Sequence, residues 1–162
     1  AEVTNSRTIN ITGGQAGSAF NFDNNTYGFT KINQTINLNA IEKWTIVNNN
    51  IFGHSFHVHD VQFKIIARSS GAVGEHESGW KDTVYVPLGE TVTVIAKFDD
   101  FSDAVNPYMY HCHFSQHEDD GMMGQFVVTG TPLGNNISSP STKFKLYPNP
   151  VNNKLFIHIN AH

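Results

Sequence analysis

Short runs of alternating hydrophobic and polar residues follow one another along most of the chain. The clearest is TVTVIAKF (91–98), in which Val92, Val94, Ala96 and Phe98 fall on one face of an extended strand. Seven other runs are rich in β-branched and aromatic residues: RTINIT, QTINL, EKWTIVN, FHVHDVQFKIIA, DTVYVP, YMYHCHF and GQFVVTG. Turn signals such as PLGE (87–90) separate the runs, and no helical period of useful length occurs. The pattern predicts an all-β, Greek-key β-sandwich or small barrel, with the tryptophans and phenylalanines in its core.

The composition changes after Gly130. Residues 131–142, TPLGNNISSPST, are polar and rich in Pro, Ser and Asn, as is typical of a linker. Beyond them, KFKLYPNPVNNKLFIHINAH (143–162) predicts two strands around a Pro-Asn-Pro turn. We therefore expect a β-domain over residues 1–130, a linker over 131–142 and a short β segment over 143–162.

Length and charge restrict the class of protein. The 162 residues are enough for one well-buried domain. A formal net charge of −4 argues against nucleic acid or an anionic membrane surface as the main partner. No apolar run is long enough for a membrane span, and the N-terminus AEVTNSRT has no signal pattern, so we expect a mature or truncated chain. The single cysteine excludes an internal disulfide.

Six of the nine histidines lie in two motifs, which are HSFHVH (54–59) and HCHFSQH (111–117). Because side chains alternate along a strand, His57 and His59 are predicted to share one face. By the same rule His111 and His113 point to one side of their strand and Cys112 to the other. Such clustering indicates metal ligands. For His76, His158 and His162 the interpretation remains a buried, hydrogen-bonded histidine or a simply exposed one.

The residue types favour copper. Cys112, His117 and Met122 supply a thiolate, an imidazole and a thioether, and His54 is the candidate for the second imidazole; this is the blue-copper ligand set. Zinc also accepts Cys and His but gives no reason for the methionine. Cys112 as a nucleophile is the other alternative. Met123 competes with Met122 for the axial position, and Gly121 is expected to allow the turn that brings Met122 back to the metal.

The two motifs, together with GWKDTVYVP (79–87) and KFDDFSDAVNPYMYHCH (97–113), resemble the C-terminal cupredoxin domain of multicopper oxidases, especially bacterial laccase-like, copper-efflux and bilirubin oxidases. The resemblance covers about residues 5–130. It implies a type 1 copper site at His54, Cys112, His117 and Met122. It further implies that His57 binds the type 2 copper, and that the type 3 pair is bound by His59, His111 and His113.

The resemblance also implies an activity. Electrons from a reducing substrate would pass from the type 1 copper through Cys112 to His111 and His113, and dioxygen would be reduced to water at a trinuclear cluster. The reductant is expected to be a phenol, an aromatic amine or a low-valent metal ion. Glu118, directly after the His117 ligand, would pass protons toward the cluster.

The chain departs from the family pattern at two positions, and it carries only half of the family's cluster ligands. Ser55 replaces the usual proline, and Asp60 the usual glycine. The family's cluster takes eight imidazoles, and this chain carries four of them, so N-terminal oxidase domains or a second subunit would complete it. The alternative function is a blue-copper electron-transfer protein without oxidase activity.

The tail LYPNPVNNKLFI resembles the start of a type IX secretion sorting domain. This second resemblance implies a secreted, periplasmic or cell-surface location.

Overall fold

The structure is a computed structural model that describes residues 2–130, 144–147, 153–154 and 156–159. It divides into two units, Ala1–Pro132 and Leu133–His162. The strands of the first unit are β1 (Asn5–Gly13), β2 (Phe20–Phe22), β3 (Gln34–Asn37), β4 (Ala40–Asn48), β5 (His54–Val58), β6 (Phe63–Arg68), β7 (Thr83–Val86), β8 (Thr91–Phe98), β9 (Asp103–Cys112) and β10 (Met123–Thr129). Its helical elements are α1 (Ser115–Asp119) and two 3-10 turns, Gln15–Gly17 and Glu75–Glu77.

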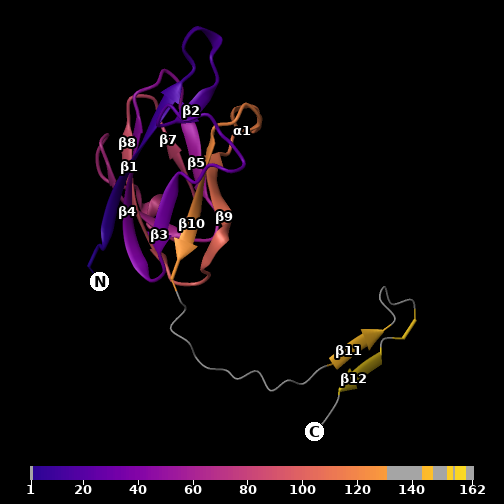
Figure 1. The fold of residues 1–162 in the computed structure, drawn as a ribbon. Coiled ribbons are helices and arrows are strands. Elements are labelled where there is room, and N and C mark those ends of the chain that lie inside the picture. Colours follow the sequence, from indigo (N-terminus) through magenta and orange to yellow (C-terminus); the bar gives the residue numbers. More distant parts are fainter. Residues whose placement is uncertain (1, 131–143, 148–152, 155, 160–162) are drawn as a thin grey trace. The chain divides into compact units, whose positions relative to one another are not determined.

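The strands of this unit form two five-stranded sheets, in the orders β2-β1-β4-β8-β6 and β3-β10-β9-β5-β7. Figure 1 shows the two sheets curled around each other, with α1 at the same end as β2. β1 runs parallel to β4 and β3 parallel to β10, while the other pairs are antiparallel. From β2 to β9 each successive strand lies in the other sheet. The predicted all-β sandwich is confirmed.

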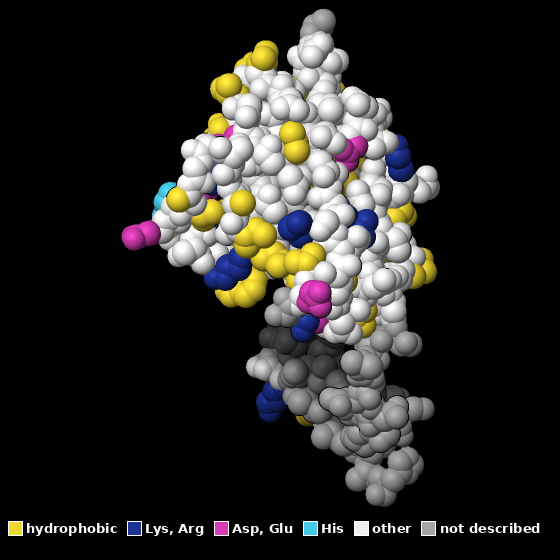
Figure 2. Space-filling model, turned by 90° about the vertical axis from the view of Figure 1, so that its left-hand side faces the viewer, with side chains coloured by type: hydrophobic (Ala, Val, Ile, Leu, Met, Phe, Trp, Pro, Cys, Tyr) yellow, Lys and Arg dark blue, Asp and Glu magenta, His cyan; other side chains and the backbone are white. Residues whose placement is uncertain are grey.

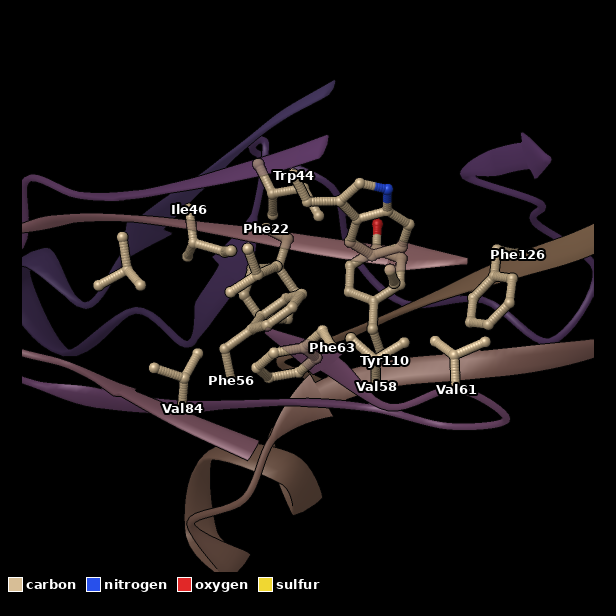
Figure 3. Packing of buried hydrophobic residues seen from close by; sticks show 14 of the residues in the cluster. Phe22, Trp44, Ile46, Phe56, Val58, Val61, Phe63, Val84, Tyr110 and Phe126 are labelled. Carbon is tan, nitrogen blue, oxygen red and sulfur yellow. The ribbon is translucent and has the colours of Figure 1, made fainter. Parts of the chain in front are cut away.

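The core lies between the sheets and follows the sequence alternation. Val92, Val94, Ala96 and Phe98 are all buried on the inner face of β8, as predicted. Figure 3 shows Trp44 of β4 close to the ring of Tyr110 of β9, across the interior from one sheet to the other. Each such ring removes a large apolar area from water and so stabilises the packing of the two facing sheets.

The run FHVHDVQFKIIA is divided between two strands in different sheets, β5 and β6. Asp60 lies between them with a φ of 74°, a left-handed conformation that ends the extended strand. The buried positions change parity across this turn, from Phe56 and Val58 to Val61 and Phe63. Each half therefore still places its apolar face toward the core.

The prediction that all tryptophans and phenylalanines are core residues is wrong for several of them. Trp80 is 60% exposed, and Lys64 Nζ lies 4.9 Å from the centre of its ring. The exposed phenylalanines of the described residues are Phe29, Phe52, Phe101, Phe114 and Phe156. Figure 2 shows one face of the molecule, on which apolar side chains lie among charged ones. These rings stand in loops, at the edges of elements or in the second unit, where alternation gives no information.

The second unit contains a two-stranded antiparallel sheet of β11 (Phe144–Tyr147) and β12 (Phe156–Ile159). This confirms the two predicted strands. The Pro-Asn-Pro turn and the predicted linker lie outside the described residues. Among the described residues, none of the helices has the length and apolar character needed to span a membrane.

Candidate metal centre

Two neighbouring strands carry the histidine motifs. β5 pairs with β9 so that Phe56 faces Cys112 and His57 faces His111. Because side chains opposite each other in a sheet point to the same face, this register puts Cys112 on the core side and His57 with His111 on the outer side. The pairing therefore produces two groups of ligand atoms, one on each face of the same sheet.

The core-side group consists of His54, Cys112 and His117, whose ligand atoms all lie within 4.8 Å of one another. The Sγ atom of Cys112 lies 3.7 Å from Nδ1 of His54 and 3.5 Å from Nδ1 of His117. His54 and Cys112 have no exposed surface. Nε2 of His54 is buried without a hydrogen-bond partner among the described residues. Its Nδ1 is thus the nitrogen that the fold directs at the other ligands.

Met122 is held at this group by its backbone. Its carbonyl accepts a hydrogen bond from the N–H of Cys112 at 3.0 Å, and its own N–H donates to the carbonyl of His117 at 2.9 Å. The side chain is fully buried. Gly121 has a φ of 90°, so the turn predicted before Met122 is present and has a left-handed backbone conformation at this glycine. Met123 lies in β10 opposite His111 and is only partly buried.

Two phenylalanines for which no role at the site was predicted cover the histidines of this group. The ring of Phe20 lies 4.7 Å from that of His54 and 4.6 Å from that of His117. Phe114 packs edge-on against His117 at 5.6 Å. Phe20 belongs to a short strand distant in sequence and outside any clear alternation, so no local signal indicates its place. Phe114 directly follows HCH, and this position next to the ligands is the one sequence signal that could have indicated its contact with His117.

The outer group consists of His57, His59 and His111, whose ligand atoms also lie within 4.8 Å of one another. Nε2 of His59 lies 3.2 Å from Nε2 of His111. The ring of His113 stacks on that of His111 at 5.5 Å and lies 5.2 Å from that of His57. The structure therefore brings the two predicted pairs together on one face, His57 with His59 from β5 and the turn after it, and His111 with His113 from the end of β9.

Hydrogen bonds fix which nitrogen of these rings is free. Nδ1 of His57 lies 2.9 Å from the carbonyl oxygen of Asp82 and 3.0 Å from Oγ1 of Thr83. Nδ1 of His111 lies 3.1 Å from the carbonyl oxygen of Cys112. A carbonyl only accepts, so Nδ1 is the protonated donor in both rings and Nε2 keeps its lone pair for a metal. Asp82 and Thr83 lie in GWKDTVYVP, and nothing in that stretch predicted their contact with His57.

Glu118 is the carboxylate nearest to His111. Its Oε2 lies 3.4 Å from Nδ1 of His111, and its side chain is 38% exposed whereas that of His111 is 6% exposed. Glu118 belongs to α1, the short helix that also carries His117. One carboxylate thus lies between solvent and a histidine of the outer group.

The electrostatics of both groups suit metal binding. Burial, followed by repulsion from His117, lowers the pKa of His54 to about 4. Burial likewise lowers the pKa of His57, His59 and His117. These imidazoles are neutral at pH 7, as a metal ligand must be.

The donor set of the core-side group fits copper. Burial raises the pKa of the Cys112 thiol, so a bound metal would have to displace its proton. One thiolate, two imidazoles and a buried methionine on the neighbouring turn are the residues of a blue-copper site. The outer group offers imidazoles alone. Of the remaining histidines, His76 is exposed, and the side chains of His158 and His162 lie outside the described part.

Comparison with known proteins shows the family of the chain. Residues 2–131 match the sequence profile of the multicopper oxidase family. The chain is 41% identical over 98 residues to a bilirubin oxidase of Albifimbria verrucaria, covering 57% of this chain and 17% of that protein. It is 32% identical over 143 residues to a laccase of Bacillus stratosphericus, covering 76% of this chain and 28% of that protein. The chain thus spans less than a third of the length of these relatives.

Solved structures give the same result. The multicopper oxidase McoA from Aquifex aeolicus superposes with a TM-score of 0.71 at 28% identity, covering 80% of this chain and 32% of that one. The laccase-like oxidase CueO from Ochrobactrum sp. gives a TM-score of 0.70 at 26% identity, covering 78% of this chain and 31% of that one. The fold is therefore cupredoxin-like, and the chain belongs to the multicopper oxidase family.

Proposed function

We propose that this chain is the part of a laccase-type multicopper oxidase that binds the type 1 copper and half of an oxygen-reducing cluster. The type 1 ligands are His54, Cys112, His117 and Met122. The type 2 ligand is His57, and the type 3 ligands are His59, His111 and His113. Copper, when bound, supplies one-electron redox chemistry at the first site and reduction of dioxygen to water at the second.

One observation carries the proposal: Cys112 and His111 are joined by a single peptide unit yet belong to different groups of ligand atoms. His113 extends the link on the other side of Cys112, and its ring packs in the outer group. Two covalent paths therefore connect the buried thiol to the outer imidazoles. A protein that only stored copper, or only transferred electrons between partners, would need no such link.

Glu118 is proposed to move protons to the outer group. Its carboxylate has access to solvent and lies 3.4 Å from Nδ1 of His111. Reduction of dioxygen to water consumes protons, and a half-exposed carboxylate beside the histidines is a suitable carrier.

The remaining parts of the proposal concern partners and location. The other imidazoles of the cluster would come from N-terminal oxidase domains of a longer chain or from a second subunit. The reductant would be a phenol, an aromatic amine or a low-valent metal ion. We propose a cupredoxin domain over 1–130, a linker over 131–142 and a sorting segment over 143–162 that directs the protein to the cell surface or beyond.

Copper content, absorption spectrum, molecular mass and oxygen uptake of the purified chain test the proposal together. A monomer is expected to bind type 1 copper and show an intense visible band without reducing dioxygen. An assembly that supplies the other imidazoles is expected to add a near-ultraviolet shoulder and consume oxygen. In that assembly His57→Ala should abolish oxygen uptake and keep the visible band, while His76→Ala, at an exposed position, should change neither. A monomer of this chain that reduces dioxygen would contradict the shared cluster.

A further inference from the structure

The ring of His54 lacks the second hydrogen bond that usually orients a metal-binding histidine. Its Nδ1 lies 3.7 Å from Sγ of Cys112, and its Nε2 is buried without a hydrogen-bond partner in the part of the chain that the structure describes. A histidine that binds a metal almost always donates its other ring N–H to an acceptor, which fixes the ring. The placement of His54 therefore depends on packing, by rings such as Phe20, and on the backbone that carries it.

One buried side chain, Asn48 at the end of β4, organises the backbone that enters β5. It has no exposed surface. Its Nδ2 lies 2.8 Å from the carbonyl oxygen of Phe52 and 3.0 Å from those of Val86 and Pro87. Its Oδ1 accepts a hydrogen bond from the N–H of Asn50 at 3.0 Å. Since a carbonyl only accepts and an N–H only donates, these partners fix which end of the amide is the nitrogen.

These contacts reach both segments that set the position of His54. Phe52 is two residues before His54, in the loop over residues 49–53. Val86 is the residue of β7 that pairs with His54 in the β5–β7 ladder. One amide therefore ties the loop before the ligand to the strand position opposite it.

The burial of this amide makes its contacts restrictive. Burying an amide is unfavourable unless its polar atoms are paired, and a buried polar group that is fully paired favours one arrangement of its neighbours. Asn48 is paired at both its nitrogen and its oxygen. A shift of the loop away from β7 would break at least one of these hydrogen bonds, and water could not replace it because Asn48 is inaccessible. The loop is thus restrained where it brings Nδ1 of His54 to Cys112.

We propose that Asn48 is a positioning residue for the core-side group, which holds the loop 49–53 against β7 so that Nδ1 of His54 faces the sulfur of Cys112. The inference rests on the proposed type 1 site and goes beyond its ligand set. Asn48 itself lies outside the groups of ligand atoms. Its loss would therefore leave every ligand in the chain and change only how well His54 meets the metal.

Asn48→Leu tests this role, and Gln125→Met is its matched control. Leucine nearly preserves the volume of Asn48 and removes its hydrogen bonds. Gln125 is a second buried amide, 4% exposed, whose Nε2 donates to three carbonyls within residues 28–31. That segment carries none of the proposed ligands. Both variants are expected to lose similar stability in denaturant unfolding, because each leaves three backbone carbonyls without their donor.

Copper affinity at the thiolate then separates the two variants. Each chain is titrated with copper(II) against a competing chelator and followed by the visible band, which reports the core-side group alone because Cys112 is the single cysteine. Asn48→Leu is expected to bind copper about tenfold more weakly than the wild type, the scale found when a partner that orients a ligand is lost. Gln125→Met is expected to keep the wild-type affinity.

The outcomes distinguish the inference from the proposed function. A folded Asn48→Leu protein with wild-type affinity would overturn the inference and leave the type 1 site standing. Equal weakening in both variants would also overturn it, since the loss would then follow from stability and not from the position of His54. A wild-type chain without the visible band would instead overturn the proposed function.

A measurement on the unsubstituted chain covers the case in which Asn48→Leu does not fold. NMR relaxation of the metal-free chain is expected to give the backbone amides of residues 49–53 order parameters of about 0.85, as in a rigid strand. Values below about 0.6, which are typical of a flexible segment, would contradict the inference.

Discussion

Cys112 and His111 are consecutive residues whose side chains lie on opposite faces of one sheet. Sγ of Cys112 is 3.5 Å from Nδ1 of His117 on the core side, and Nε2 of His111 is 3.2 Å from Nε2 of His59 on the outer side. This relationship follows from the strand itself, since neighbouring side chains of β9 must alternate. The backbone between Cys112 and His111 is therefore the shortest covalent path between the core-side group and the outer group.

Replacing Cys112 by serine is expected to abolish the visible band and the electron transfer while the fold remains. The band and the path to His111 both require the thiolate, whereas serine nearly preserves the buried volume. Absorption and circular dichroism of copper-loaded Cys112→Ser check this. A variant with visible absorption near the wild-type level would refute the assignment of the thiolate.

Replacing Met122 by leucine is expected to raise the reduction potential without loss of copper. A weak axial donor stabilises the oxidised metal more than the reduced one, so its removal favours reduction. Met123→Leu is the matched control, because Met123 is partly buried in β10 opposite His111. Potentiometric titration of both variants distinguishes them. If Met123→Leu shifts the potential and Met122→Leu does not, the axial ligand is Met123.

Much of the fold and of the two ligand groups could be predicted because strand periodicity governs them. The alternation of Val92, Val94, Ala96 and Phe98 predicted the buried face of β8. The same rule predicted that the side chains of His111 and Cys112 point to opposite faces of their strand. These are local consequences of extended geometry, and they hold whatever the rest of the chain does.

Other features depend on contacts between distant segments and left no periodic signal. Phe20 covers His54 and His117 from a strand of three residues. The tautomer of His57 is set by the carbonyl of Asp82, and a backbone atom carries no sequence signature. The division between β5 and β6 did leave a signal, namely the change of buried parity between Val58 and Val61.

The ion pair between the partly buried Arg7 and the buried Glu42 is expected to make stability depend on pH in the acid range. Burial alone would raise the pKa of Glu42, but hydrogen bonds from Arg7, Asn5 and Trp44 outweigh it and lower the pKa below its ordinary value of 4.5. Since the pKa is lower in the folded state, the stabilisation is complete above about pH 4.5 and is lost as the pH falls through the folded pKa.

Glu42→Gln tests this dependence. The variant is expected to lose about 2 kcal/mol of unfolding free energy at pH 7, the scale of a hydrogen bond to a charged group, and to lose less on acidification than the wild type. Asp99→Asn is the control, because the Lys97–Asp99 pair is about half exposed and such pairs contribute about 0–1 kcal/mol. Denaturant unfolding across pH 3–7 measures both. Parallel pH profiles for wild type and Glu42→Gln would show that this carboxylate is not responsible.

Gly121→Ala is expected to destabilise the chain by about 1 kcal/mol, because a side chain costs that much in the left-handed conformation found here. The added Cβ would meet Tyr27 at 3.6 Å, an ordinary contact, so the cost comes from the backbone. Gly79→Ala, where φ is not positive and the space is open, is the matched control. Thermal unfolding checks the difference, and a Gly121→Ala protein as stable as Gly79→Ala would contradict it.

X-ray absorption at the copper edge of the copper-loaded chain tests the central claim most directly. The claim is that the fold builds a copper site from Cys112, His54 and His117. It predicts one short copper–sulfur bond and two copper–nitrogen bonds per site, with the sulfur contribution lost in Cys112→Ser. A copper shell of nitrogen and oxygen alone in the wild-type chain would contradict the account.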